Sequence, residues 1–327
     1  MEVDRNIERA MKITPDKTLG HDVKAGIEPP ATSEKARDSL IVRPDPEDPR
    51  LTEKVDGIDQ DGRQTTTSVT VERPLTLYLN KREIVTMMTI CDYPEYLAVG
   101  YLANQNMLHP DDKITAVEYV DDIEAVIVRT THETDFEDKL RKKTLTSGCA
   151  QGTVFGDVME KFETITLPED AEIRTSWLHA LTKTVNTTPS LYLEAGAIHG
   201  CVLCQRDQPL LYMEDVGRHN AVDKIAGYMY MNGMSGGDKI FYTTGRLTSE
   251  MVIKTVQMGI PILVSRSGFT AWGVDLARQV GLTLIGRARG RRFIALAGEN
   301  RIVFDAAQDA RGDEDEPHTH QRKGAKS

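Results

Sequence analysis

The chain has 327 residues, with 40 Lys and Arg against 50 Asp and Glu, so its formal net charge is −10 at pH 7. A net negative charge argues against a basic nucleic-acid-binding protein, which carries an excess of Lys and Arg. Hydrophobic residues make up 39% of the sequence, enough for a sizeable core in one large domain or two smaller ones. No apolar run approaches the roughly 20 residues of a membrane-spanning helix, and the charged start has no secretion signal. We therefore expect a cytoplasmic protein.

Both ends of the chain differ in composition from the middle. Residues 1–68 hold six prolines among Glu, Asp, Lys and Thr, with few aromatic residues. Such a segment cannot bury enough surface to offset its chain entropy, so we expect a mobile N-terminal arm. Residues 306–327 have the same character and predict a disordered tail. The domain is then 69–305, with an N-terminal part at 69–150 that ends in a cysteine loop and an α/β part at 151–305.

The first part of this domain has strand patterns around one helix. Residues 68–80 alternate apolar and polar side chains as a strand does, although Pro74 favours an edge position or a break. Apolar side chains in 92–108 have helical spacing. Residues 116–120 and 124–130 predict two strands joined by a turn.

Strand and helix patterns alternate in the second part. They predict a helix at 173–188, strands at 195–207 and 209–215, a helix at 220–233, then strand 238–245, helix 249–259, strand 260–266, helix 271–281, strand 282–287 and a final strand at 291–298. The strand–helix–strand–helix–strand order predicts a parallel sheet with right-handed connections and covering helices. Functional residues are then expected in loops at the carboxyl ends of the strands.

Cys149 lies in the sequence TSGCAQG, between Gly148 and Ala150. Glycine allows a tight, mobile loop with open approach to the sulfur. The preceding basic residues 141–143 would lower the pKa of the thiol and raise its thiolate fraction. This is the pattern of a nucleophile, and an ordinary loop cysteine is the alternative.

The sequence HGCVLC contains a second pair of cysteines and a histidine. The CxxC spacing of Cys201 and Cys204 suggests zinc, but a four-ligand site needs a second suitable pair. The segment is strand-like, so the two thiols should point to opposite faces, buried as small hydrophobic side chains. His199 has little structural reason to stand in a strand and is a candidate site residue.

Polar residues gather in EDVGRHNAVDK, residues 214–224, where a strand leads into a helix. Arg218 and His219 beside a helix N-terminus favour an anion, and Asn220 is a candidate helix cap. A salt-bridged cap without a ligand is the alternative.

A second cationic segment follows the strand at 282–287. It reads Arg287, Ala288, Arg289, Gly290, Arg291 and Arg292. Guanidinium groups match phosphate oxygens in two-point contacts, so the segment predicts a clamp for a pyrophosphate. A solvated turn is the alternative, and an RNA patch is disfavoured because no aromatic residues are interleaved. Gly245, Arg246 and Ser267 follow two other strands and could hydrogen-bond a nucleotide.

With these residues assembled, the chain resembles the FdhD family of formate dehydrogenase accessory sulfurtransferases. The resemblance covers about residues 70–305, in ERPLTLYLN, DYPEYLAVGYL, TSGC, GAIHG, EDVGRHNAVDK, GRLTSEMVIK, GIPILVSRS and LTLIGRARGRR. It implies an α/β protein with a cytidine-deaminase-like α/β/α fold, a layered mixed sheet and a homodimer.

The resemblance also implies the function. Members carry persulfide sulfur from a cysteine desulfurase to the molybdenum or tungsten bis(molybdopterin guanine dinucleotide) cofactor, which is then inserted into formate dehydrogenase. The sulfur-carrying position falls on Cys149, and the segment that contacts the dinucleotide falls on Arg287 to Arg292. Binding of a guanine nucleotide resembling guanosine diphosphate is therefore expected. No protein-bound metal, nucleic acid or membrane is expected as part of the function.

One departure from the family concerns the loop cysteine. Many relatives have CxxC there, whereas this chain has CAQG, with Gly152 at the second position. A disulfide between loop thiols is thus excluded, and Cys149 must pass its sulfur directly. Two other classes stay open: a cofactor-binding chaperone without cysteine chemistry, and a nucleotide deaminase. A deaminase needs an HxE and PCxxC pattern, whereas His199 is followed by Gly200 and Cys201.

Overall fold

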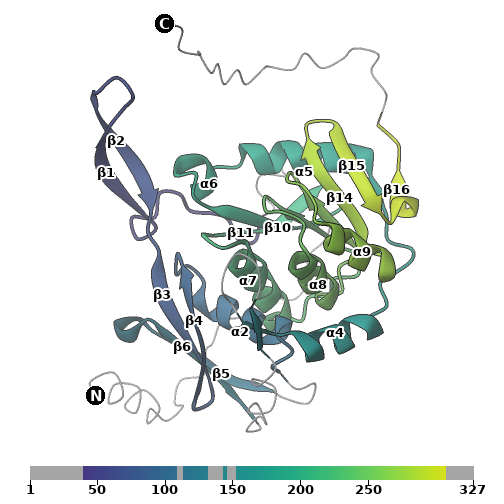
Figure 1. Cartoon of the computed structure of the whole chain (residues 1–327), viewed down its shortest axis with the longest axis horizontal. Helices are drawn as coiled ribbons and strands as arrows, with labels where there is room; N and C mark the ends of the chain where they lie inside the picture. The colour runs from purple at the N-terminus through teal and green to yellow at the C-terminus, as the bar shows by residue number, and fades with distance from the viewer. Residues whose placement is uncertain (1–39, 109–112, 132–142, 146–151, 307–327) are drawn as a thin grey trace, which may run out of the picture.

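The computed structural model describes residues 40–108, 113–131, 143–145 and 152–306 (Figure 1). The first elements are β1 (Thr52–Ile58), β2 (Gln64–Thr70), β3 (Arg73–Leu79), β4 (Arg82–Thr89), α2 (Pro94–Asn104), β5 (Ile114–Val120), η2 (Asp121–Ile123), β6 (Ala125–Thr130), β7 (Lys143–Leu145) and β8 (Gly152–Val154). There follow α4 (Phe155–Thr164), β9 (Ile173–Arg174), α5 (Thr175–Thr187), α6 (Leu191–Glu194), β10 (His199–Gln205), β11 (Gln208–Asp215), α7 (Arg218–Met231) and β12 (Ile240–Thr243). The last are α8 (Ser249–Gln257), β13 (Ile262–Ser265), α9 (Ala271–Gln279), β14 (Thr283–Arg289), β15 (Arg292–Ala297), η3 (Glu299–Arg301) and β16 (Ile302–Val303).

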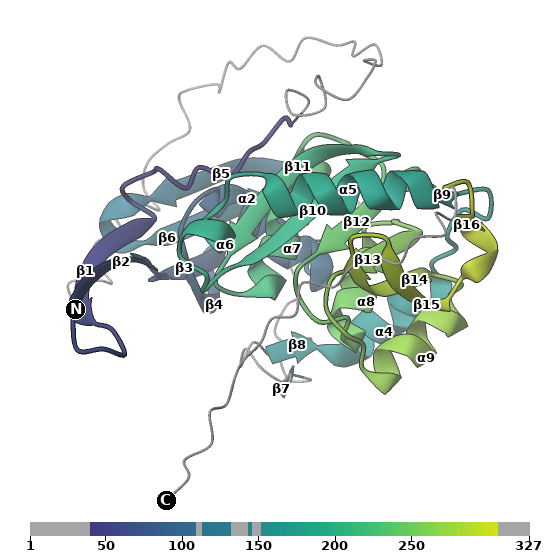
Figure 2. The same cartoon turned by 90° about the horizontal axis from the view of Figure 1, so that it is seen from above.

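A six-stranded mixed sheet forms the larger layer, in the order β11-β10-β12-β13-β14-β15. Strands β12, β13 and β14 are parallel and are connected by α8 and α9, whereas the other pairs are antiparallel. Helices α4, α7, α8 and α9 share one buried cluster with one face of the sheet, and α5 shares another with the opposite face. Figure 2 shows α5 on one side of the strands and α8 and α9 on the other. The predicted α/β/α layered mixed sheet is confirmed.

Alternation along β10 explains how this sheet serves two cores. Cys201 and Leu203 pack with α7, whereas Val202 and Cys204 pack with α5. Both cysteines are fully buried, so the prediction that they are buried on opposite faces is confirmed. Burial raises the pKa of Cys201 to about 12, and it raises the pKa of Cys204 as well. Neither thiol is therefore suited to nucleophilic chemistry at neutral pH.

A smaller four-stranded sheet, in the order β4-β3-β6-β5, packs against α2. The predicted strands at 116–120 and 124–130 are confirmed as β5 and β6, which are antiparallel. The strand predicted at 68–80 is interrupted, since β2 ends at Thr70 and β3 begins at Arg73. Pro74 itself lies within β3, where it faces β4 alone because pairing with β6 begins at Thr76, and such an edge position suits a residue that cannot donate a backbone hydrogen bond.

Helices α2 and α7 join the two sheets through a very close crossing. A Cβ atom on Gly100 would lie 1.7 Å from the carbonyl oxygen of Asp223, and one on Gly227 would lie 1.9 Å from that of Tyr96. Only glycine allows the two backbones to approach so closely. The Asn104 amide also donates to Asp223 Oδ1 at 2.7 Å. The crossing therefore fixes how the small sheet sits on the large one.

The predicted mobile arm is wrong over residues 40–68. The Ile41 amide donates to the Leu210 carbonyl at 2.8 Å, and the Tyr212 amide donates to the Val42 carbonyl at 3.0 Å, so this segment adds to the edge of β11. Strands β1 and β2 then form an antiparallel hairpin. Composition did not reveal these elements, because backbone pairing holds them and they bury few apolar side chains of their own. The domain boundaries at 69 and 305 stay predictions, and residues 1–39 and 307–327 lie outside the described residues.

The last described residues hold the start of α5. Strand β16 pairs with β9 in parallel. The Asp305 carboxylate accepts hydrogen bonds from the Ser176 amide at 2.9 Å and the Ser176 hydroxyl at 2.7 Å, while the Asp305 amide donates to Thr175 Oγ1. The residue before α5, Arg174, makes no capping hydrogen bond with its side chain. Asp305 therefore serves as the N-terminal cap of a helix that begins 130 residues earlier in the chain.

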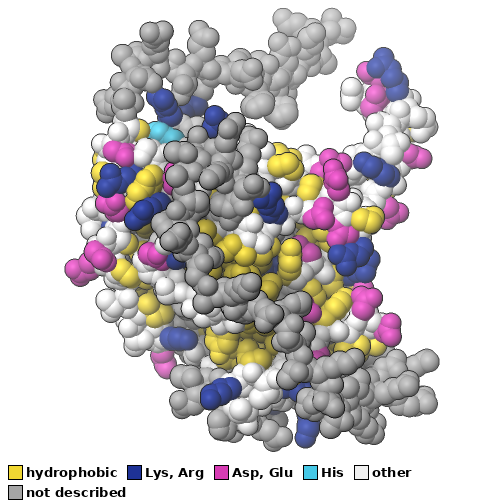
Figure 3. Space-filling model, turned by 180° about the vertical axis from the view of Figure 1, so that it is seen from behind, with side chains coloured by type: hydrophobic (Ala, Val, Ile, Leu, Met, Phe, Trp, Pro, Cys, Tyr) yellow, Lys and Arg dark blue, Asp and Glu magenta, His cyan; other side chains and the backbone are white. Residues whose placement is uncertain are grey.

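The outer surface mixes charges of both signs. On the face shown in Figure 3, Lys and Arg side chains alternate with Asp and Glu around a central group of hydrophobic side chains. Cations on the described part of this face are thus interspersed rather than continuous. None of the helices in the described ranges has the length and hydrophobicity needed to cross a bilayer.

Candidate functional site

The carboxyl ends of β12, β13 and β14 meet at one edge of the large sheet. Strand β10 runs antiparallel to β12, with Cys201 opposite Thr243, so its first residue, His199, lies at the same edge. Helix α7 begins beside it with Arg218, because β11 ends at Asp215, the partner of His199 in the ladder. The edge therefore collects residues from segments far apart in the sequence, as expected for a parallel α/β unit.

A tight turn after β12 shapes the centre of this edge. The Thr244 amide donates to the Gly200 carbonyl at 2.9 Å, and the Gly200 amide donates to Thr244 Oγ1 at 3.0 Å. The Gly245 amide donates to Thr243 Oγ1 at 3.1 Å. A Cβ atom on Gly245 would lie 2.9 Å from Arg218 Cδ. Gly245 thus leaves room for the Arg218 side chain to lie across the turn.

Arg218 is the strongest indication of a ligand at this edge. The residue is 5% exposed, and its Nε and Nη2 atoms are buried without a hydrogen-bond partner among the described residues. A buried charged group without partners costs several kcal/mol, so an anion that binds it recovers a large free energy. The N-terminus of α7, where Arg218 stands, adds a favourable dipole.

Two histidines and a further arginine surround Arg218. Burial lowers the pKa of His199, and the nearby charges of Arg218, His219 and Arg246 act in the same direction. Burial also lowers the pKa of His219, although its Nε2 atom lies 2.9 Å from Glu250 Oε2, which opposes the shift. Both imidazoles are therefore neutral at neutral pH, in a region of positive potential.

The arginine segment lies at the same edge but in a different conformation from that predicted. Strand β14 continues to Arg289 and β15 begins at Arg292, so the arginines belong to a hairpin rather than to a turn after a short strand. Gly290 has a φ of 55°, as such a turn requires. Arg287 sits at a register shift and its amide donates to the Ser267 carbonyl at 2.8 Å. Ala288 is buried against the α5 side of the sheet and serves packing.

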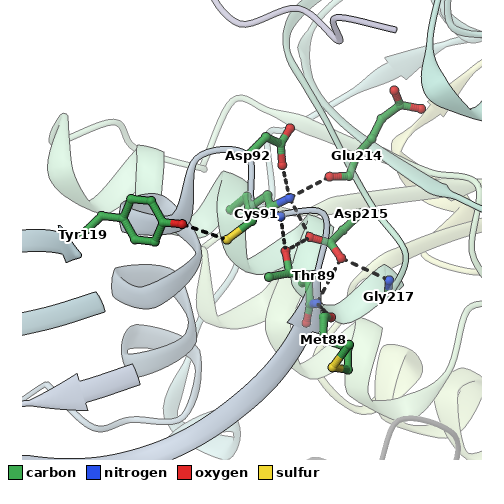
Figure 4. A network of polar contacts seen from close by, with 10 residues as sticks. Met88, Thr89, Cys91, Asp92, Tyr119, Glu214, Asp215 and Gly217 are labelled. Atoms are coloured by element: carbon green, nitrogen blue, oxygen red, sulfur yellow. Dashed lines mark hydrogen bonds and ion pairs between the residues drawn. The ribbon is translucent and has the colours of Figure 1, made fainter. Parts of the chain in front are cut away.

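The other half of the polar motif at 214–224 is a buried ion-pair network (Figure 4). Lys224 Nζ lies 2.6 Å from Asp215 Oδ2, contacts Asp92, and donates to the Glu214 carbonyl at 2.8 Å. The salt-bridged alternative therefore holds for these residues. Burial opposes the charge of Lys224, but its two carboxylate partners outweigh burial and raise its pKa.

Two more residues of this motif have structural roles. The prediction that Asn220 caps the helix is wrong, because the cap residue is Gly217. The side-chain amide of Asn220 instead donates to the Met88 carbonyl at 2.8 Å and to Asp215 Oδ1 at 3.1 Å. The Glu214 carboxylate accepts from the Leu191 amide at 2.8 Å, at the start of α6. Burial raises the pKa of Glu214 to about 7, so the group titrates near neutral pH.

Cys149 lies outside the described residues. The segment 146–151 that contains it connects β7 to β8, whose closing pair is Leu145 with Gly152. Its role as the reactive thiol stays a prediction.

Sequence reasoning missed Glu250 and Arg266. Glu250 lies in the first turn of α8, where it contacts His219. Arg266 stands directly between Ser265, the last residue of β13, and Ser267. A charged residue at the end of an apolar strand was a usable signal, because this is where α/β proteins place functional side chains. No group of three or more His, Cys, Asp or Glu side chains in the described part of the chain is arranged to hold a metal ion.

Replacing Arg218 with Met should raise the free energy of unfolding by about 1 kcal/mol while abolishing anion binding at this edge. The reason is that the Nε and Nη2 atoms of Arg218 are buried and make no hydrogen bond within the described part of the chain, and an apolar side chain of similar length removes that penalty. Urea unfolding measures the stability, and titration with guanosine diphosphate measures the binding.

Arg301→Met is the matched control, because the buried Arg301 guanidinium donates to the Pro168 and Gly281 carbonyls. This variant should lose about 1–3 kcal/mol and keep its anion binding. Equal losses of stability in the two variants would show that Arg218 has no such penalty to relieve.

The chain matches a family model, curated relatives and a solved structure over most of its length. The family model described as FdhD/NarQ family matches residues 70–303. "Sulfur carrier protein FdhD" of Wolinella succinogenes is 30% identical over 246 residues, which cover 74% of this chain and 84% of that protein. The protein of the same name from Bacillus subtilis is 29% identical, over 71% of this chain and 88% of that one.

A crystal structure from Desulfotalea psychrophila, assigned as a candidate formate dehydrogenase accessory protein, is 26% identical with a TM-score of 0.62. The match covers 77% of this chain and 99% of that one. The matched region 70–303 contains both sheets and every described residue of the carboxyl edge. The chain therefore belongs to the FdhD/NarQ family.

Proposed function

We propose that this protein is a sulfur carrier in the maturation of formate dehydrogenase, with Cys149 as the carrier. Relatives named sulfur carrier protein FdhD support the role, as does the family match. The observation that carries the proposal from the molecule itself is the buried Arg218 side chain, whose Nε and Nη2 atoms have no hydrogen-bond partner among the described residues, at an edge lined by further cations. Such an edge suits a strongly anionic substrate.

The substrate of this edge is the molybdenum bis(molybdopterin guanine dinucleotide) cofactor. Its phosphate groups carry the charge that Arg218, Arg246 and the exposed arginines of the β14–β15 hairpin would bind. His199 and the turn at Thr244 and Gly245 lie beside Arg218, where the nucleotide would contact them. Guanosine diphosphate, which shares the terminal portion of the cofactor, should bind the same residues.

Transfer of sulfur proceeds in two steps. The Cys149 thiolate attacks the outer sulfur of a persulfide on a cysteine desulfurase. A new sulfur–sulfur bond forms on Cys149, the bond within the donor breaks, and the donor leaves as a thiolate. The outer sulfur then passes from Cys149 to the metal as a sulfido ligand. The cofactor metal supplies the two electrons that this step requires, and Cys149 returns as a thiolate.

The partners follow from this role. A cysteine desulfurase donates the sulfur and the catalytic subunit of formate dehydrogenase receives the finished cofactor. We place the protein in the cytoplasm as a homodimer, in keeping with the resemblance described above. Because Gly152 replaces the second loop cysteine, no intramolecular disulfide releases the sulfur, and delivery depends on direct attack at Cys149.

Sulfur loading tests the proposal directly. After incubation with a cysteine desulfurase and cysteine, the intact mass of the wild-type protein should increase by one sulfur atom, whereas Cys149→Ala should show no increase. Cys201→Ala is the matched control and should load fully, because its thiol is buried and its pKa is raised to about 12. Loading of Cys149→Ala, or full activation of formate dehydrogenase by that variant, would contradict the role of Cys149.

A further inference from the structure

Arg266 and Tyr192 form a stacked pair at the carboxyl edge of the sheet. The Arg266 Cζ atom lies 5.2 Å from the centroid of the Tyr192 ring. Arg266 Nη1 also donates to Asn186 Oδ1 at 3.2 Å. Both members of the pair are half-buried. Across the described ranges, no carboxylate forms an ion pair with Arg266, and the two side chains that contact it there, Asn186 and Tyr192, are neutral.

The pair lies on the opposite face of the sheet from Arg218. Arg218 belongs to α7, whereas Asn186 belongs to α5, on the other face. Arg266 also acts electrostatically on Tyr242, whose ring packs in the cluster shared with α5. The edge therefore carries a cation on each face of the sheet, Arg218 on one and Arg266 on the other. Arg266 belongs to neither of the two cationic motifs, residues 214–224 and 287–292.

The backbone holds Tyr192 in position. Its amide donates to Glu214 Oε1 at 3.0 Å, which ties α6 to the end of β11. Arg266 is tied to the end of β13, where its own amide donates to the Thr243 carbonyl at 3.4 Å. The two side chains thus approach each other from opposite flanks of β10 and β12, over the strand ends that carry His199 and Thr244.

We propose that Tyr192 and Arg266 form a stacking site for the nucleobase of the bound nucleotide. A tyrosine ring and a guanidinium plane both stack on flat heteroaromatic rings, and the positive charge of Arg266 adds attraction for an anionic ligand. The inference rests on the nucleotide-bearing substrate of the proposed function and deepens it, because it separates base recognition by Tyr192 and Arg266 from phosphate recognition by Arg218.

Titrations with two ligands test the stacking site. Guanosine diphosphate and inorganic pyrophosphate are each titrated into wild-type protein, Tyr192→Leu and Tyr192→Phe. Tyr192→Leu should bind guanosine diphosphate at least five-fold more weakly, because stacking of a base on one aromatic ring is worth about 1 kcal/mol or more. The same variant should bind pyrophosphate within two-fold of wild type, because pyrophosphate has no base. Tyr192→Phe keeps the ring and should bind both ligands as wild type does.

Arg266→Gln provides a second variant that leaves the anchoring of α6 intact. It should also weaken guanosine diphosphate by more than it weakens pyrophosphate, and melting temperatures confirm that each variant is folded. The stacking site is contradicted if Tyr192→Leu and Arg266→Gln bind guanosine diphosphate as wild type does, or if their affinity for pyrophosphate falls as much as that for guanosine diphosphate. Either result leaves the proposed function itself untouched. If the wild-type protein binds no guanosine diphosphate, the nucleotide part of the proposed function falls as well, while sulfur loading of Cys149 still reports on the carrier role.

Discussion

Lys224→Met will lower the free energy of unfolding by about 3–5 kcal/mol. Lys224 is fully buried between Asp215, which is also fully buried, and Asp92. Without the ammonium group, both carboxylates stay inside the protein with no cation between them, and Glu214 lies close by. Breaking a buried pair by removing one partner costs far more than the pair itself contributes, because a charge is left uncompensated.

Urea unfolding at pH 7 measures this loss, and Lys183→Met is the control. Lys183 is an exposed residue of α5, and its replacement should change stability by less than about 0.5 kcal/mol. The loss in Lys224→Met should shrink as the pH falls from 7 to 5, because burial raises the pKa of Asp92, so this carboxyl group takes up a proton more readily when folded than when unfolded. If Lys224→Met lowered the free energy of unfolding by less than about 1 kcal/mol at pH 7, the carboxylates of Asp92 and Asp215 would not depend on Lys224 for compensation of their charge.

Gly100→Ala should destabilise the protein by at least about 3 kcal/mol, although alanine favours an isolated helix over glycine by about 1 kcal/mol. The added Cβ atom would overlap the Asp223 carbonyl, which is backbone and cannot turn away as a side chain could. Helices α2 and α7 would have to separate, and the small sheet would no longer pack against the large one in the same position. Thermal melting and the yield of folded protein measure this effect.

Gly57→Ala is the matched control for the crossing. Gly57 lies in the exposed strand β1, where an added Cβ atom would meet nothing within 4 Å. This variant should melt within a few degrees of wild type. If Gly100→Ala were as stable as Gly57→Ala, the close approach of the two helices would not be a requirement of the fold.

The regular part of the fold could be predicted because local patterns and long-range packing agree there. Residues 238–287 alternate apolar strands with amphipathic helices, and the structure places β12, α8, β13, α9 and β14 on these patterns. The β1–β2 hairpin could not be predicted in the same way, because its strands are mostly exposed and lack an apolar face. Its two strands pair with each other over a short span of sequence, but the exposed polar side chains along them show no apolar alternation that would mark a strand.

The site could be predicted in part. Arg218 and Gly245 lie at this edge because they follow the carboxyl ends of β11 and β12, as the strand–helix order implied. His199 joins them because β10 runs antiparallel to both strands and begins at the same edge. The fate of the acidic residues in the same motif could not be foreseen. Lys224 pairs with Asp92, which lies 132 residues away in the sequence, and no spacing rule connects them. A motif dense in charge therefore contains both Arg218, the residue of the proposed anion site, and Lys224, which is paired with buried carboxylates.

The capping of α5 by Asp305 has a consequence for how the chain folds during synthesis. The ribosome makes Thr175 long before Asp305, and at ~5–20 residues per second the interval for 130 residues is on the order of 10 s. During that time the start of α5 lacks its cap, Asp305, and strand β9 lacks its pairing partner, β16. The helix that covers one face of the large sheet therefore gains its N-terminal cap only after Asp305 has emerged, and a ribosome that stalls before Asp305 leaves the start of this helix uncapped.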